Sequence, residues 1–291
     1  MVAVGGDSGT GKATFCAGLR EIFGEERCTE VRLDGYLAFS RAQRNAVGLT
    51  PLDPRTHDFA AMDRDLWQLS HGHPIVKPVY DHHLGAIAGT ETIEPRELVL
   101  AHGMFPLYTP VLRSFFDVTV WMEPDPDLTT EWMVQRDIRE RGYREEQVRT
   151  EIARRRPDYE QYIAPQAQYA DLRATFTREK VTFHKGPRLA PLDFRELESE
   201  STHFRLLGGW KDGAYPRTII EVDTAIDAAT ARRVEDKLWS QIAPRDMVRP
   251  PVGTYRDMDG NHRSPALAIA QLLVARRISL VAEELAGAVA V

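Results

Sequence analysis

Cysteine is scarce in this chain of 291 residues, with Cys16 and Cys28 as its two representatives. Two cysteines are too few for a disulfide framework and are typical of a protein of the reducing cytosol. Runs of about eighteen apolar residues are missing, so we expect no membrane partner. Residues 1–5 lack the basic segment of a secretory signal. The sequence therefore predicts a cytoplasmic protein.

An excess of positive charge is also missing. The chain has 37 Lys and Arg against 43 Asp and Glu, for a formal net charge of -6. This balance argues against a general nucleic-acid binder and leaves room for a local basic pocket. Hydrophobic residues make up 43% and charged residues 27%, which is the composition of a globular protein.

The order of apolar segments predicts an α/β fold. We expect short strands at residues 1–5, 31–33, 98–101 and 118–122, and helices at 12–23, 63–69, 111–116 and 127–156. The polar segment 38–63 is expected to form a long loop. Strands that alternate with helices in this way form a parallel sheet with helical crossovers.

Beyond residue 187 the order of elements changes. We expect strands at 204–207 and 218–222 and helices at 228–242 and 265–286. The chain is therefore predicted to have a core at 1–190 and a C-terminal α+β extension at 191–291, packed together as one compact unit. The strand at 218–222 could pair across a subunit edge, so a homodimer stays open.

A phosphate-binding loop is predicted between the first strand and the first helix. The segment fits the pattern G-x-x-x-x-G-K, in which glycines let backbone N–H groups curl around phosphate oxygens at a helix N-terminus. The lysine of this pattern reaches the β- and γ-phosphates of a nucleotide. The residues expected to bind ATP are Gly6, Asp7, Ser8, Gly9, Thr10, Gly11, Lys12, Ala13 and Thr14.

Asp34 is the candidate catalytic base. It directly follows the second predicted strand, at the carboxyl edge where ligands bind in open α/β sheets. A carboxylate there can accept the proton of an attacking hydroxyl in phosphoryl transfer. A turn or capping aspartate is the alternative, and the phosphate loop upstream favours the catalytic role.

Several segments in order resemble the phosphoribulokinase family, most of all its plant, cyanobacterial and archaeal branch. They are Asp7-Ser-Gly-Thr-Gly-Lys-Ala-Thr-Phe15, Leu33-Asp-Gly-Tyr36, Leu52-Asp-Pro-Arg-Thr-His-Asp-Phe59, Lys77-Pro-Val-Tyr-Asp-His82, Gln135-Arg-Asp-Ile-Arg-Glu-Arg-Gly142 and Ile163-Ala-Pro-Gln-Ala-Gln-Tyr-Ala-Asp171. The resemblance implies a P-loop kinase with three α/β/α layers and a mostly parallel, mixed sheet. It implies transfer of the γ-phosphate of ATP to ribulose 5-phosphate, with Mg²⁺ or another divalent ion.

The resemblance also implies roles for single residues. Asp34 and Lys12 match catalytic positions of the family. Residues that match its sugar-phosphate site are Arg41, Tyr80, His82, Arg136 and Arg141. Guanidinium groups suit a phosphate dianion, although Arg141 could instead pair with Asp137 one helical turn away.

Four residues depart from the family pattern. Ala13 replaces the hydroxyl residue that binds the metal, and His102 replaces a glutamate that serves it. Leu37 and Met133 replace a histidine and a lysine of the family. Thr14 and His102 are the remaining candidates for metal ligands, although a shift of one residue turns a helical side chain by about 100°, and imidazole suits Mg²⁺ poorly.

Three functions stay open at this point. The first is a kinase of the phosphoribulokinase type with ATP and a sugar phosphate as its small-molecule partners. The second is a non-catalytic homologue that keeps the fold and binds nucleotide in a regulatory role. The third is a nucleoside kinase similar to uridine kinase, against which the segment 163–171 and the C-terminal extension argue.

Overall fold

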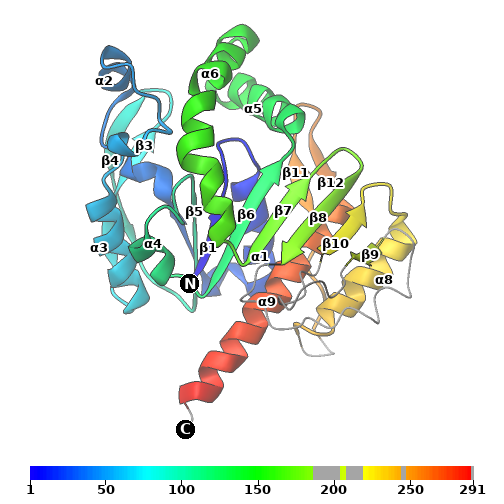
Figure 1. Cartoon of the computed structure of the whole chain (residues 1–291). Coiled ribbons are helices and arrows are strands. Elements are labelled where there is room, and N and C mark those ends of the chain that lie inside the picture. Colours follow the sequence, from blue (N-terminus) through cyan, green and yellow to red (C-terminus); the bar gives the residue numbers. More distant parts are fainter. Residues whose placement is uncertain (186–203, 208–218, 244–246, 290–291) are drawn as a thin grey trace, which may run out of the picture.

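A mixed sheet of eight strands forms the centre of the computed structural model, which describes residues 1–185, 204–207, 219–243 and 247–289 (Figure 1). The strand order is β2-β5-β1-β6-β7-β8-β10-β9, parallel from β2 to β7 and antiparallel beyond. The strands are β1 (Val2–Gly5), β2 (Cys28–Arg32), β5 (Leu98–Gly103), β6 (Val118–Pro124), β7 (Leu172–Phe176), β8 (Lys180–Lys185), β9 (Phe204–Leu207) and β10 (Ile219–Asp223).

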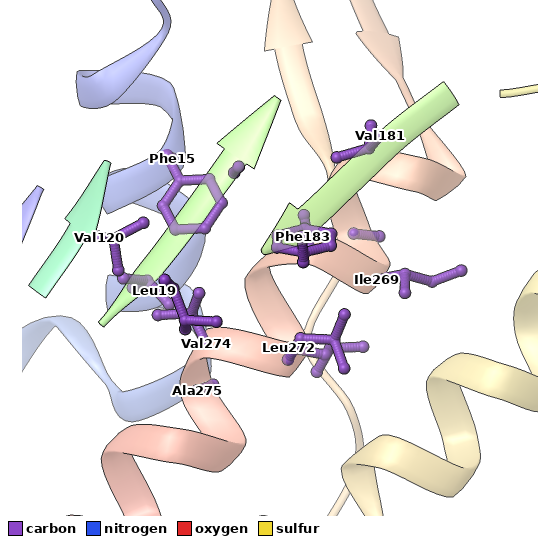
Figure 2. Close-up of a cluster of buried hydrophobic side chains, with 14 of the residues drawn as sticks. Phe15, Leu19, Val120, Val181, Phe183, Ile269, Leu272, Val274 and Ala275 are labelled. Atoms are coloured by element: carbon purple, nitrogen blue, oxygen red, sulfur yellow. The ribbon is translucent and has the colours of Figure 1, made fainter. Parts of the chain in front are cut away.

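Helices cover both faces of this sheet. α1 (Lys12–Phe23), α8 (Ala228–Trp239) and α9 (Pro265–Val289) pack on one face, and Figure 2 shows side chains of α1 and α9 meeting those of the sheet, among them Phe15, Phe183 and Leu272. α3 (Phe59–Ser70) and α4 (Pro110–Ser114) share a second apolar cluster with Val31, Val99 and Trp121 of the strands. The predicted three-layer α/β fold is thus confirmed.

α9 is long and apolar, with a mean hydropathy of 1.5 in its most apolar window, and by length and composition alone it could cross a membrane. Within the fold, however, 67% of that window is buried, and the helix contacts α1 and α8. Its hydrophobicity is therefore explained by its place in the core.

The helix predicted over 127–156 is two helices. α5 (Pro126–Arg141) ends at Gly142, which has a φ of 66°, and α6 (Glu145–Asp158) starts after a short turn. Glycine adopts this left-handed conformation without the steric cost that a side chain brings. The helical pattern predicted over this range is confirmed, and the glycine divides it into two helices.

Other elements were not predicted. The segment expected to be a loop contains α2 (Arg41–Ala46), which Ser40 and Gln43 stabilise by a reciprocal capping box. Strands β7 and β8 and two separate hairpins also went unpredicted: β3 (Ile75–Asp81) with β4 (Ala86–Ile93), and β11 (Thr254–Arg256) with β12 (Asn261–Arg263). Short segments with other helical geometry are η1 (Glu25–Arg27), η2 (Leu33–Tyr36), η3 (Pro54–Thr56), η4 (Tyr159–Ile163) and η5 (Ala164–Tyr169).

The strand expected at a subunit edge lies inside the sheet. β10 pairs with β8 on one side and with β9 on the other, so it has no open edge for a second subunit. The proposed boundary at residue 190 lies outside the described residues.

Candidate active site

A cavity of about 510 Å³ opens where the parallel strands β1 and β5 end. Its lining runs from residues 8–14 of the phosphate loop and Asp34 to Trp132 of α5 and on to Tyr255 of β11. This volume is within the range of about 300–1,000 Å³ that is usual for small-molecule sites. The cavity therefore has both the predicted nucleotide loop and the predicted base, Asp34, in its lining.

The phosphate loop has the backbone shape that its glycines predict. Gly6, Gly9 and Gly11 have φ values of 149°, 80° and 82°. A Cβ on Gly6 would lie 2.5 Å from the backbone oxygen of Met122, so a side chain is excluded there. The loop leads directly into α1, whose first backbone N–H groups and dipole favour an anion.

Lys12 lies inside the curl of this loop. Its Nζ donates to the backbone oxygen of Gly6 at 3.0 Å and to that of Asp7 at 2.5 Å. Burial lowers the pKa of Lys12 to about 8, although the carboxylates of Asp34 and Asp7 oppose this shift. These two hydrogen bonds therefore hold the ammonium group among the loop atoms that would surround a nucleotide phosphate.

Asp34 lies in η2, just beyond the end of β2, as predicted. Its Oδ1 is buried without a hydrogen-bond partner among the described residues. Burial favours the neutral acid, but the positive charge of Lys12 and the imidazoles of His82 and His102 outweigh it and lower the pKa of Asp34. The carboxylate is thus ionised at neutral pH, with one oxygen available to accept a proton.

Two of the predicted arginines lie on α5 beside the phosphate loop. Arg136 donates to Ser8 Oγ at 3.1 Å and pairs with Asp137 at 2.7 Å. Arg141 also pairs with Asp137, at 3.2 Å. The helical spacing predicted a surface ion pair between Asp137 and Arg141. In the structure, Asp137 pairs with Arg136 as well, and all three charged side chains are largely buried. Asp137 thus orients two guanidinium groups, of which that of Arg136 belongs to a residue that lines the cavity.

The other residues predicted to bind the sugar phosphate are Arg41, Tyr80 and His82, which lie near one another but are not among the residues that line the cavity. Arg41 donates to the backbone oxygen of His82 at 2.5 Å, and the ring of His82 meets that of Tyr80 edge to face at 5.3 Å between centroids. The hydroxyl of Tyr80 also accepts a hydrogen bond from Arg44. Arg44 was not among the residues predicted from the sequence. Burial lowers the pKa of His82 to about 4, and Arg141 adds to this effect. His82 is therefore neutral at pH 7.

Sequence reasoning also missed Arg155 of α6. Its Nη2 donates to both carboxylate oxygens of Asp7 at 3.2 Å, and to the sulfur of Met133 at 3.3 Å. The pair is buried, with 8% and 13% of the two side chains exposed. Arg155 thus fixes the first turn of the phosphate loop. A run of three arginines at 154–156 was the available signal.

The metal side of the site does not fit a divalent ion held by protein ligands. Ala13 has no donor atom, and Nε2 of His102 lies 2.8 Å from Oε1 of Glu30. The hydrogen bond from His102 helps to lower the pKa of Glu30 to about 2. Thr14 lines the cavity, but the described residues contain no group of three His, Cys, Asp or Glu side chains that could hold a metal.

Known proteins resemble this chain in sequence. The sequence model of the phosphoribulokinase / uridine kinase family matches residues 1–182. Phosphoribulokinase of Synechocystis is 40% identical over 172 residues, which cover 59% of this chain and 52% of the relative. The chloroplastic enzyme of Mesembryanthemum crystallinum is 31% identical over 188 residues, covering 59% and 47%. Uridine kinase of Lactiplantibacillus plantarum is 31% identical over 179 residues, covering 59% and 84%.

A solved structure supports the fold. Phosphoribulokinase from Rhodobacter spheroides superposes with a TM-score of 0.57 at 16% identity, covering 83% of this chain and 96% of the other. In sequence, the chain spans about half the length of the phosphoribulokinases it matches.

Proposed function

The chain belongs to the phosphoribulokinase / uridine kinase family, and we propose that it transfers the γ-phosphate of ATP to a hydroxyl group of a sugar phosphate, ribulose 5-phosphate being the first candidate. The observation that carries this proposal is the position of Asp34. Its unpartnered carboxylate oxygen shares one cavity with Lys12 of the phosphate loop. An ionised base and a cation for the nucleotide phosphates are two of the groups that kinases supply to this reaction.

Each side chain has a defined task in this reaction. Asp34 accepts the proton of the attacking hydroxyl. Lys12 and Arg136 place positive charge at the transferred phosphoryl group, where negative charge must be stabilised. Arg141 and Arg41 flank His82 and offer guanidinium groups to the phosphate of the acceptor. Phosphoryl transfer depends mainly on such positioning and charge neutralisation.

Membership in this family implies a divalent ion as well as ATP. The ion supplies charge neutralisation at the phosphates when it accompanies the nucleotide. Since Ala13 and His102 offer it no protein ligand here, we assign the tasks above to Lys12, Asp34 and the arginines alone. The identity of the ion, Mg²⁺ or another, is part of the proposal.

We further propose a cytoplasmic location, with ATP and the sugar phosphate as partners. Support comes from the cysteines, both of which are buried and unpaired. Burial raises the pKa of Cys28 to about 11 and raises that of Cys16 further, so both thiols stay protonated and unreactive.

An acceptor panel tests the proposal. ADP release is measured with ATP, Mg²⁺ or Mn²⁺, and either ribulose 5-phosphate or uridine, and the phosphorus NMR spectrum identifies the product. We expect ADP release with ribulose 5-phosphate and a product with two phosphate resonances. Turnover with uridine alone would instead show a nucleoside kinase. ATP binding without turnover of either acceptor would show the non-catalytic homologue.

A further inference from the structure

The β11–β12 hairpin lies at the same end of the sheet as the phosphate loop (Figure 1). Tyr255, Arg256 and Asp257 of this hairpin line the same cavity as residues 8–14 of the loop. A segment more than 240 positions away in the sequence therefore contributes a wall to the site. The phosphate loop accounts for the polyphosphate of ATP, and the hairpin end of the cavity is left without a function.

The base of the hairpin is fixed to the first helix. Gln271 of α9 is fully buried, and its Oε1 accepts a hydrogen bond from the N–H of Gly253 at 2.8 Å. Its Nε2 donates to the backbone oxygens of Thr14 at 3.2 Å and Phe15 at 3.4 Å. Gly18 leaves room for this amide, because a Cβ at position 18 would lie 2.0 Å from Nε2 of Gln271. One amide thus sets the hairpin's position relative to the phosphate loop.

Further contacts hold the hairpin at its base and along its side. Arg263 pairs with Glu235 of α8 at 2.6 Å, and the Glu235 side chain is 1% exposed. Arg139 of α5 donates to the backbone oxygen of Arg256 at 3.0 Å. These contacts join the hairpin to α8 and to α5, so its cavity-facing residues are held in place.

The hairpin end of the cavity has the chemistry of a nucleobase site. Trp132 and Phe176 line it as an edge-to-face pair with centroids 6.2 Å apart. Tyr255 is 36% exposed and has the imidazole of His262 beside its ring, with centroids 5.6 Å apart. Asp257 adds a polar group at the same end. Planar bases stack on aromatic rings and hydrogen-bond at their edges.

We propose that the β11–β12 hairpin forms the nucleobase end of the ATP site, with the Tyr255 ring stacking on the adenine. This inference rests on the proposed function, because it takes the phosphate loop as the polyphosphate site. It assigns a role in nucleotide recognition to the C-terminal part of the chain, which lies outside residues 1–182 of the family match. Tyr255 and its neighbours then determine how strongly the base contributes to binding.

Calorimetry with two ligands tests the inference on the full chain. ATP carries phosphates and a base, whereas inorganic tripolyphosphate carries phosphates alone. Tyr255→Ala is expected to weaken ATP binding about tenfold, the usual effect of losing one stacked ring, and to leave tripolyphosphate binding within about twofold of the parent. Tyr255→Phe, which keeps the ring, should bind ATP nearly as the parent does.

Met258→Ala provides the matched control, since Met258 lies in the same hairpin turn, is 55% exposed and does not line the cavity. Unchanged ATP affinity in Tyr255→Ala would overturn the inference, as would an equal loss for ATP and tripolyphosphate. A parent chain that binds tripolyphosphate as tightly as ATP would also overturn it while leaving the phosphate loop intact. A parent that binds neither ligand would contradict the proposed function itself.

Discussion

The two sides of the phosphate loop differ in what their side chains contact. On the side of Asp34, that carboxylate keeps an unpartnered oxygen, and Arg136 donates a hydrogen bond to Ser8 of the loop. On the metal side, Ala13 has no donor, and His102 is engaged by Glu30. The side of Asp34 therefore keeps a charged group available to a ligand, whereas on the side of His102 the polar groups pair with each other.

This difference bears on the proposed phosphoryl transfer. A buried carboxylate oxygen without a hydrogen-bond partner costs stability. At Asp34, unlike at Asp63, this oxygen belongs to a residue that lines the cavity, which supports the proposed role as base. The His102–Glu30 contact has no such cost, because each group satisfies the other and Arg20 also pairs with Glu30 at 2.7 Å. The side of Asp34 therefore carries the observations on which the proposed catalysis rests.

The largest effect is expected from removing the cation of the phosphate loop. Lys12→Met keeps the length of the side chain and removes the charge that faces the nucleotide phosphates. Turnover should fall on the order of 10²- to 10³-fold, as for other lost electrostatic contributors, and ATP affinity should fall with it. Arg232→Met, an exposed change on α8, is the control. Kinase activity that persists in Lys12→Met would remove the loop from the mechanism.

Variants of Arg136 and Arg141 should distinguish effects on the nucleotide from effects on the acceptor. Arg136 contacts the phosphate loop and is assigned to the transferred phosphoryl group, so Arg136→Ala should lower kcat and raise KM for ATP. Arg141 pairs with Asp137, and its charge acts on the His82 imidazole, so under the proposed function Arg141→Ala should raise KM for the acceptor alone. A charge-assisted contact is worth about 10- to 100-fold. Steady-state kinetics with each substrate varied will show the split, and identical profiles for the two variants would refute it.

Restoring the metal side should have a moderate effect. Ala13→Ser supplies the missing hydroxyl, and His102→Glu supplies the missing carboxylate. Because Glu30 lies 2.8 Å from His102, Glu30→Gln is needed to avoid two adjacent carboxylates. The three changes together should raise turnover and the Mg²⁺ dependence of ATP affinity about tenfold, and each alone should do little. Strictly additive effects would show that the groups do not serve one ion.

The smallest expected effect is on the pH dependence of the free energy of unfolding, through His82. Burial lowers the pKa of His82 from 6.5 to about 4, so the native state binds fewer protons than the unfolded state between these values. The free energy of unfolding should therefore fall as pH drops from 6.5 to 4. After screening by solvent, we expect about 1 kcal/mol from this group.

Urea unfolding at several pH values measures this contribution. His82→Gln should have a flatter pH dependence than the parent, while His73→Gln, at an exposed position, should follow the parent. A slope unchanged by His82→Gln would place the pH dependence elsewhere.

The sequence predicts those features that depend on local patterns. The glycine spacing at residues 6–11 predicts the phosphate loop, and the apolar runs predict β1, β5 and β6 because each is buried on both faces. β7 also has a readable signal, since Leu172, Ala174 and Phe176 are directed inward in alternation. β3 is harder to predict because Pro78 interrupts it, and most of β4 is exposed.

Contacts between distant segments could not be predicted. Arg155 and Asp7 are 148 positions apart, and their pairing depends on how α6 crosses the loop. Glu30 and His102 meet because β2 and β5 are neighbours in the sheet. The β11–β12 hairpin consists largely of exposed residues without an apolar pattern, so its place beside the phosphate loop becomes visible in the folded chain.

Asp34 provides the most direct test of the central claim, that one working transfer site remains beside an altered metal side. Turnover of ATP with ribulose 5-phosphate is compared in the parent, Asp34→Asn and Asp63→Asn, with ATP affinity measured on the same samples. Asp63 is a matched control, because its Oδ1 is also buried and unpartnered, but on α3 away from the cavity.

If Asp34 is the base, Asp34→Asn should lose about 10²- to 10⁴-fold in turnover and keep ATP affinity within about twofold, while Asp63→Asn should turn over as the parent does. Parent-level turnover in Asp34→Asn would contradict the account.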